Sequence, residues 1–231
     1  MPTISGIIVP TGLESGGRRT LREIVDERGR PYDSADSTFR ALAGDAFRAA
    51  VRTMNVKGLW PWEILEEDIT ITSGTDKYTL SGAVKKPLAL HHLSGSAGVR
   101  DQKFVYIPYD QFMETYDQNT EGEPNIYTIP NLFETGQIQV WPIPNANDYA
   151  RITYYRVTPI PKNDDEVVEV PEFALETYIA YAWFELSKRL PAAQTRYPSQ
   201  VALSDARRSF RELAAHINMP GDRSRSPMWV W

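Results

Sequence analysis

The sequence predicts an α+β fold: a discontinuous helical bundle with an inserted antiparallel β-rich module and extended termini. Near both ends of the 231-residue chain, apolar residues repeat with the spacing of amphipathic helices. Between these segments they alternate with polar residues, which is typical of strands. Because the first long helix needs the last two helices to cover its apolar stripe, we expect one bundle from residues 34–62 and 165–218, and a β module from residues 63–164.

The N-terminal part of the chain is predicted to contain an arm, a short helix and a long helix. Residues 1–33 form the arm and the short helix, an amphipathic run over 21–28. Ser34, Asp36 and Ser37 are candidate N-caps of the long helix, and Gly58 marks its end. The apolar stripe of this helix covers four turns: Phe39, Leu42, Ala43, Ala46, Phe47, Ala50, Val51 and Met54.

The β module is predicted from strand-like segments that are separated by proline and glycine. We expect strands at residues 69–72, 77–80, 88–93 and 104–107. We also expect a hairpin over residues 132–141, with Thr135 and Gly136 in its turn, and a further strand at 151–157 that pairs with this hairpin.

Two more helices are predicted after Pro171. The first, over residues 172–190, has a stripe of Leu175, Tyr178, Ile179, Ala182, Leu186 and Leu190. Tyr181, Trp183 and Phe184 extend its apolar surface, so two neighbouring helices or another subunit should cover it. The second helix covers 199–217 and is followed by a tail, residues 219–231, that ends in Met228, Trp229, Val230 and Trp231. Exposed aromatics of this kind usually bind a partner.

Composition excludes several classes of function. The chain has no cysteine, which excludes disulfides, thiolate catalysis and Cys-ligated zinc. It has no run of 18 apolar residues, so we expect a soluble intracellular chain with no membrane partner. Its formal net charge of −5 argues against tight, sequence-independent binding of nucleic acid.

Candidate chemical motifs are weak, and we expect no enzyme, no cofactor and no metal. His91 and His92 are adjacent in a strand pattern and therefore face opposite sides. Residues 117–122 imitate the start of a calcium loop, but Thr128 stands where a bidentate glutamate is needed. The acidic clusters at 66–68 and 164–166 could supply a glycosidase pair, yet each flanks a strand or a turn where solvated charges are common. No P-loop or nucleophile elbow accompanies them.

The order of several short motifs resembles the head-to-tail adaptor family of tailed bacteriophages, also called tail tubular or portal-adaptor proteins. The resemblance extends over about residues 34–217. The motifs, in chain order, are a helix ending in Trp60-Pro61-Trp62, Thr72 to Gly74 with Tyr78 and Leu80, Gly122 and Pro124 with Tyr127, Trp141-Pro142-Ile143-Pro144, Tyr154-Tyr155 before Pro159, and paired helices after Pro171. The chain departs from the family at Ser81, where many members have proline, and in residues 1–33.

The resemblance implies a structural virion protein at the head-to-tail interface, assembled in the host cytoplasm. It implies a ring, a homo-dodecamer, that docks under the portal protein, extends the DNA channel and offers a platform to tail or nozzle proteins. Double-stranded DNA would pass without specific binding during ejection. The bundle would form the ring, and the β module would face outward or toward tail components.

The resemblance also nominates two groups of residues. The C-terminal tail would bind the portal through Met219, Arg223, Arg225, Met228, Trp229, Val230 and Trp231. Since a ring needs two different complementary surfaces on each subunit, the first long helix and the helix at 172–190 are the expected subunit interface. The nominated interface residues are Phe39, Phe47, Tyr181, Trp183 and Phe184.

Two other classes of function stay open at this point. One is a β-rich glycan-binding module of a tail fibre, in which exposed Trp and Tyr rings would stack on sugars. The other is a hydrolase, in which one of the acidic clusters would carry the reaction.

Overall fold

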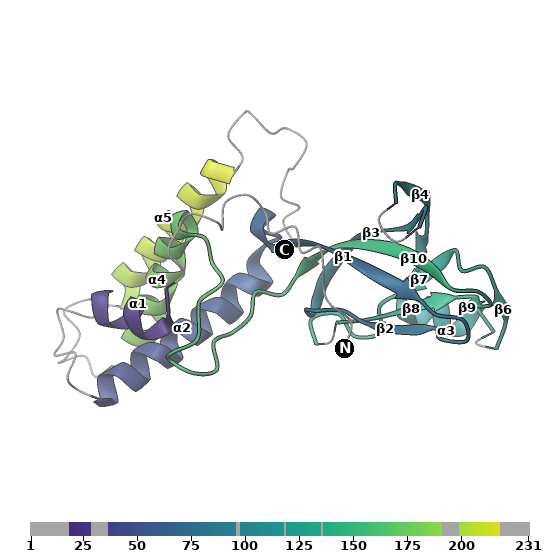
Figure 1. Ribbon diagram of the computed structural model, residues 1–231. Coiled ribbons are helices and arrows are strands. Elements are labelled where there is room, and N and C mark those ends of the chain that lie inside the picture. The colour runs from purple at the N-terminus through teal and green to yellow at the C-terminus, as the bar shows by residue number, and fades with distance from the viewer. Residues whose placement is uncertain are drawn as a thin grey trace. The chain divides into compact units, whose positions relative to one another are not determined.

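The computed structural model describes residues 19–28, 37–95, 98–117, 119–134, 136–190 and 199–217. The chain divides into two compact units (Figure 1). The β unit comprises residues 63–157, and the helical unit comprises the described residues before Glu63 and after Val157. Residues 158–164, which the sequence analysis assigned to the β module, belong to the helical unit. The arm before Arg19 and the tail from residue 218 onward lie outside the described residues.

The helical unit is built from four α-helices among the described residues. They are α1 (Leu21–Arg28), α2 (Ser37–Lys57), α4 (Glu172–Ser187) and α5 (Ser199–Ile217), with a short 3₁₀ helix η1 (Pro61–Glu63) after α2. The central helix α4 packs against both α2 and α5, and α1 packs against α2. The predicted α+β class and the predicted association of the first long helix with the last two are both confirmed.

Helix boundaries follow the local sequence closely. The bounds predicted for α1 and α5 are those observed. Helix α4 ends at Ser187 instead of Leu190, because Leu190 precedes Pro191 and a residue before proline disfavours helical backbone. Pro171 is the N-cap of α4, and its carbonyl accepts hydrogen bonds from the backbone N–H groups of Ala174 and Leu175.

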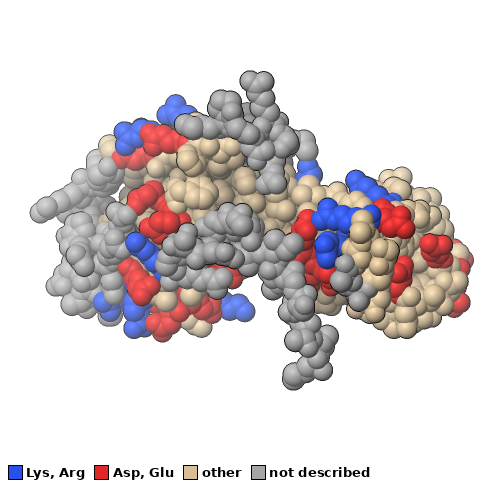
Figure 2. Space-filling view, turned by 45° about the horizontal axis from the view of Figure 1, so that its top comes forward, with Lys and Arg blue, Asp and Glu red and all other residues tan. Residues whose placement is uncertain are grey.

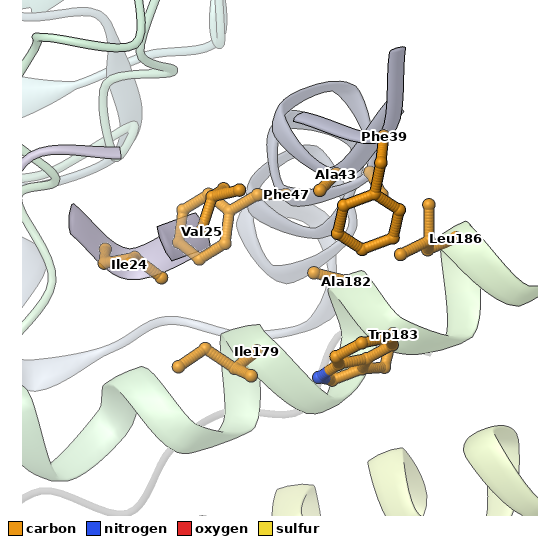
Figure 3. A pocket seen from close by; sticks show the side chains of 10 residues that line it. Ile24, Val25, Phe39, Ala43, Phe47, Ile179, Ala182, Trp183 and Leu186 are labelled. Atoms are coloured by element: carbon orange, nitrogen blue, oxygen red, sulfur yellow. The ribbon is translucent and has the colours of Figure 1, made fainter. Parts of the chain in front are cut away.

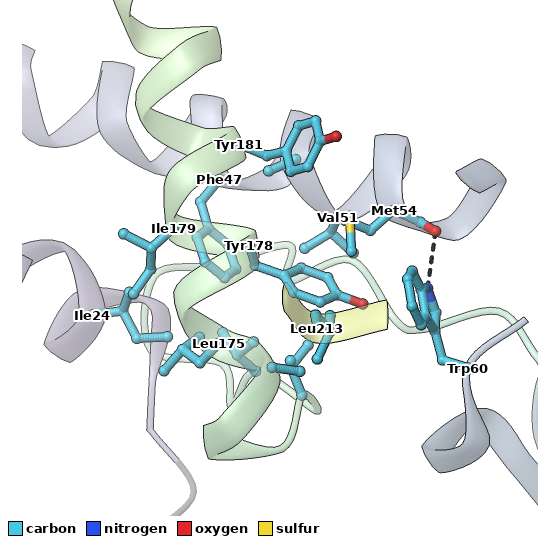
Figure 4. Close-up of a cluster of buried hydrophobic side chains, with 14 of the residues drawn as sticks. Ile24, Phe47, Val51, Met54, Trp60, Leu175, Tyr178, Ile179, Tyr181 and Leu213 are labelled. Carbon is cyan, nitrogen blue, oxygen red and sulfur yellow. Dashed lines mark hydrogen bonds between the residues drawn. The ribbon is translucent and has the colours of Figure 1, made fainter. Parts of the chain in front are cut away.

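One apolar core joins the helices of this unit (Figure 4). Trp60 is buried in it, and its indole N–H donates to the carbonyl of Met54 at 3.1 Å. The side chain of Asn55 exchanges two hydrogen bonds with the backbone of Thr158, at 2.9 and 3.0 Å. Arg48 donates to the carbonyl of Pro161 at 2.8 Å. These buried contacts fix the segment that leads from the β unit to α4 along α2.

The described residues of the β unit form two four-stranded sheets and one strand pair. The first sheet has the order β1 (Ile64–Ile71), β10 (Asp148–Arg156), β3 (Val84–Leu93), β4 (Arg100–Lys103) and is antiparallel throughout. The second has the order β2 (Lys77–Thr79), β8 (Gln137–Trp141), β7 (Ile126–Thr128), β5 (Val105–Tyr106). Its pair β5–β7 is parallel, as is the separate pair β6 (Glu121–Gly122) with β9 (Ile143–Pro144). Alternating residues of the strands fill a separate core, which includes Leu90, Ile138, Ile152 and Tyr154.

Two predicted features of the β unit are wrong. Residues 132–134 form a turn and do not pair with β8, whose partners are β2 and β7. Phe133 has a φ of 68°, which is incompatible with a strand. Gly136 is needed for a close approach, because a Cβ there would collide with the carbonyls of Gly82 and Leu80. Strand β10 pairs with β1 and β3 instead of this segment, since it lies between them with Ala150, Ile152 and Tyr154 facing the core.

A short helix, α3 (Tyr109–Thr115), was not predicted. It follows Pro108 and buries one side chain completely, that of Phe112. A single buried residue gives no helical periodicity, so the sequence offered little signal for this element.

Candidate assembly surfaces

The acidic clusters hold the fold together through hydrogen bonds. In the β unit, Arg151 binds both carboxylate oxygens of Asp68, and the hydroxyl of Tyr154 donates to Glu67 at 3.1 Å. In the helical unit, Arg48 binds Asp164 at 2.7 Å. Each of these carboxylates binds a side chain on a neighbouring strand or helix. The contacts therefore favour a structural role for the acidic clusters.

His91 and His92 lie on opposite sides of β3, as the strand pattern predicted. His92 is buried, with Nδ1 2.7 Å from Asp148 Oδ2, and its ring stacks on Phe104. His91 lies on the other face near Arg100 and Lys103, and its pKa is lowered by burial and by these two positive charges. Over the described parts of the chain, no group of three or more His, Cys, Asp or Glu side chains is arranged to hold a metal ion.

The tryptophans of the recognised motifs pack against other side chains. Trp60 and Trp62 are buried and stack with ring centroids 5.2 Å apart. Trp141 is partly buried beside Tyr116, and its indole N–H donates to the carbonyl of Asp117 at 2.8 Å. Because a sugar platform needs an open aromatic face, these three rings do not favour the glycan-binding alternative.

A row of aromatic rings runs through the helical unit, with rings from α4 and α5 at both ends and two tryptophan rings at its centre. Its neighbouring ring centroids lie 5.2–6.4 Å apart. The rings, in order, belong to Tyr181, Phe210, Trp60, Trp62, Phe173 and His216. We call this the aromatic row. Edge-to-face and stacked pairs at such distances stabilise a rigid arrangement.

Beside His216, at one end of the aromatic row, the ring of Phe173 is 53% exposed in the first turn of α4. Glu172 and Glu176 are exposed around it, and Glu172 forms an ion pair of 3.2 Å with Arg19. Charged side chains of both signs lie on the helical unit beside an uncharged area (Figure 2). Phe173 is thus an exposed apolar ring with exposed glutamates next to it in α4.

Three of the five nominated interface residues line one apolar pocket. Phe39, Phe47 and Trp183 border a cavity of about 40 Å³ between α1, α2 and α4 (Figure 3). Ile24, Val25, Ile179 and Leu186 complete much of its wall. A cavity of this size has room for a methyl group or a small apolar side-chain tip, but not for an aromatic ring.

The other two nominated residues lie apart from the pocket. Tyr181 is buried toward α5, where Lys57 Nζ lies 5.4 Å from its ring centroid. Phe184 is half-buried under Lys188, whose Nζ is 4.0 Å from the ring centroid. Helices α2 and α4, which the sequence analysis paired across subunits, pack against each other within one chain. All seven nominated tail residues lie outside the described residues.

Two features of the structure escaped the sequence analysis. Phe173 lies off the apolar stripe of α4, and an aromatic on the polar side of a helix is the signal that could have identified it. Lys85 and Glu63 form an ion pair of 2.8 Å with side chains only 3% and 1% exposed. No sequence pattern relates two residues that are brought together only by sheet formation.

Comparison with known proteins identifies the class of protein to which this fold and these surfaces belong. The model of the SU10 adaptor protein family matches residues 19–228, which include both units. The chain belongs to this family and is a head-to-tail adaptor of the tailed-bacteriophage type. The resemblance indicated by the motifs is confirmed, and with it a role as a structural connector of the virion.

Other comparisons add little detail. A chain in the neck of an empty GTA particle, computed with C6 symmetry, is 14% identical, with 79% of this chain and 87% of that chain covered and a TM-score of 0.27. No curated protein matches the chain. None of the described helices is both long and apolar enough to span a membrane.

Proposed function

We propose that this adaptor assembles as a homo-dodecameric ring under the portal protein, extends the DNA channel and provides the docking platform for tail or nozzle proteins. The observation that carries the proposal is the family match over residues 19–228, because it includes both units. Assembly takes place in the host cytoplasm, and double-stranded DNA passes through the ring without being bound specifically. The protein catalyses no reaction in this role.

The helical unit is the ring-forming part in this proposal, and the β unit, residues 63–157, faces the tail components. A closed ring needs two different surfaces on each subunit that fit each other. Partly exposed apolar groups on α4 support this assignment, since Trp183 lines the apolar pocket and Phe184 is half-buried. Phe39, Phe47 and Tyr181 are buried in the chain's own core and act by holding α2 and α4 in place behind that surface.

The C-terminal tail, residues 219–231, contacts the portal in this proposal. Its sequence combines Arg223 and Arg225 with Met228 and three further apolar residues, 229–231. Tryptophan and arginine are the residue types that most often dominate binding energy at protein interfaces.

Electron microscopy of the purified protein mixed with its portal tests the ring. We expect a symmetric ring stacked on the portal, and Trp183→Ala should weaken the ring while leaving the helical content unchanged. Particles that are complete at the portal vertex without this protein would overturn the proposal. Deletion of residues 219–231 tests the tail separately: the shortened chain should fold and lose portal binding, and retained binding would remove the tail assignment.

A further inference from the structure

The exposed Phe173 ring, next to the end of the aromatic row, has the properties of a docking site. The ring of Phe173 is 53% exposed, yet it is held edge-on to Trp62 at 5.5 Å between centroids and lies 5.6 Å from the ring of His216. Its position is therefore fixed by two neighbours before anything binds. A fixed, half-exposed aromatic is favourable for recognition, because little conformational entropy is lost on binding.

An unused hydrogen-bond donor lies beside this ring. The side chain of Trp62 is 7% exposed, and its indole N–H has no hydrogen-bond partner among the described residues. Buried indole groups usually have an acceptor. Because this N–H is enclosed by the chain's own atoms, it lies beneath the Phe173 face and not on it.

Charge around the ring favours a basic occupant. Glu172 precedes Phe173, and Glu176 lies one turn further along α4 on the same side. The Glu172 carboxylate pairs with Arg19 and still has 52% of its side chain exposed. A peptide that carries both arginine and apolar aromatic residues would complement this surface.

The chain itself contains such a peptide, and it begins next to the site. Helix α5 ends at Ile217, one residue beyond the His216 ring that contacts Phe173. Residues 222–231 contain Arg223, Arg225, Trp229 and Trp231. At about 3.3–3.6 Å per residue, the segment after Ile217 is long enough to return to Phe173. Its tether also gives it an effective concentration of about 1 mM at a site on its own chain.

We infer that residues 222–231 dock on the Phe173 face of their own chain before assembly. Trp229 or Trp231 packs on the Phe173 ring, and Arg223 and Arg225 approach Glu172 and Glu176. If the tail also binds the portal, as the proposed function states, the portal competes with the Phe173 face for the same segment. The free adaptor thereby keeps its apolar terminus covered until a portal is present.

Photo-crosslinking in the full-length monomer tests the docking. The variant Phe173→p-benzoylphenylalanine is prepared as a mixture of ¹⁵N-labelled and unlabelled chains, and crosslinks are mapped by mass spectrometry. The matched control is Val201→p-benzoylphenylalanine, because Val201 is also exposed but lies near the other end of α5, roughly 24 Å from Ile217 at about 1.5 Å per residue. A tail that is merely tethered should reach both positions.

We expect crosslinks from position 173 to residues 222–231 of the same chain, at least fivefold more abundant than from position 201. Arg223→Glu combined with Arg225→Glu should reduce them severalfold. Equal yields from the two positions, no crosslink to residues 222–231, or crosslinks only between labelled and unlabelled chains would each overturn the inference.

The outcomes separate this inference from the proposed function. If deletion of residues 219–231 abolishes portal binding but no crosslink forms, only the docking on Phe173 fails. If the crosslink forms and the deleted chain still binds the portal, the docking stands and the portal role of the tail fails.

Discussion

At the scale of single residues, Lys85 and Glu63 form an ion pair in the β unit whose two side chains are both buried. Burial lowers the pKa of Lys85, while the charge and the hydrogen bond of Glu63 oppose that shift. Removing one member of a buried pair leaves an uncompensated charge, which costs about 3–5 kcal/mol. Glu63→Gln and Lys85→Met should therefore each lower the local free energy of unfolding by about this amount.

The double variant Glu63→Gln/Lys85→Met is the matched control for this prediction. It carries no buried charge, so most of the lost stability should return. Hydrogen exchange of the β3 amides measures the local free energy of opening in all four proteins. Single variants as stable as the parent chain, or a double variant no more stable than either single one, would contradict the prediction.

The sequence could identify some buried residues but not this pair. Trp60 and Trp62 flank a proline at the end of an amphipathic helix, where large side chains often pack at a core edge, and both are buried. Lys85 has no comparable local sign, since its partner lies 22 residues away. A charge is recognised as buried only when the strands that surround it are known.

At the scale of elements, strand β10 carries a group whose ionisation should limit alkaline stability. Tyr154 is fully buried, and burial raises its pKa to about 12 from an unfolded value of 10.0. Below pH 10 the phenol is neutral in both states, so its contribution is fully present. As the pH rises from about 10 to about 12, only the unfolded chain releases the proton, and the free energy of unfolding falls by about 3 kcal/mol.

The variant Tyr154→Phe isolates this effect. It removes the hydroxyl and its hydrogen bond to Glu67, which should cost about 1 kcal/mol at neutral pH. Urea unfolding followed by circular dichroism at a series of alkaline pH values should show a shallower loss of stability in the variant. Burial also raises the pKa of Tyr127, so a weaker decline must persist. Identical slopes for the two proteins would show that Tyr154 does not control the decline.

Helices and strand partners differ in how far local sequence determines them. The bounds of α1 and α5 follow from apolar periodicity within a single segment, and both were predicted correctly. The pairing of β10 was predicted wrongly, because alternation of apolar and polar residues identifies a strand but not its partner. The buried positions of β10 instead match β1 and β3, more than 50 residues earlier in the chain. Which strands pair depends on how the apolar residues of all the strands pack into one core. The sequence of a single strand does not contain that information.

At the scale of the whole molecule, the two cores predict different behaviour for excised pieces. Every residue of the β-unit core lies between Glu63 and Val157, so the unit is covalently continuous. The helical core instead needs α2 as well as α4 and α5, and its buried Asn55–Thr158 bonds join segments on either side of the β unit. The β unit is one continuous segment of the chain, and it is inserted between the two segments that form the helical unit.

We therefore expect a polypeptide of residues 63–157 to fold by itself, and one of residues 158–231 to fail. The first retains its complete core and the Lys85–Glu63 pair, and it should unfold cooperatively in urea with dispersed amide resonances. The second lacks α2, so Tyr178 and Leu175 lose the side chains that bury them, and it should show neither dispersion nor a cooperative transition. Mixing it with a separate chain of residues 19–62 should restore helical content, because the two pieces together supply the missing core. A folded 158–231 piece would mean that α4 and α5 form a core without α2, and that the β unit is not inserted into a single helical bundle.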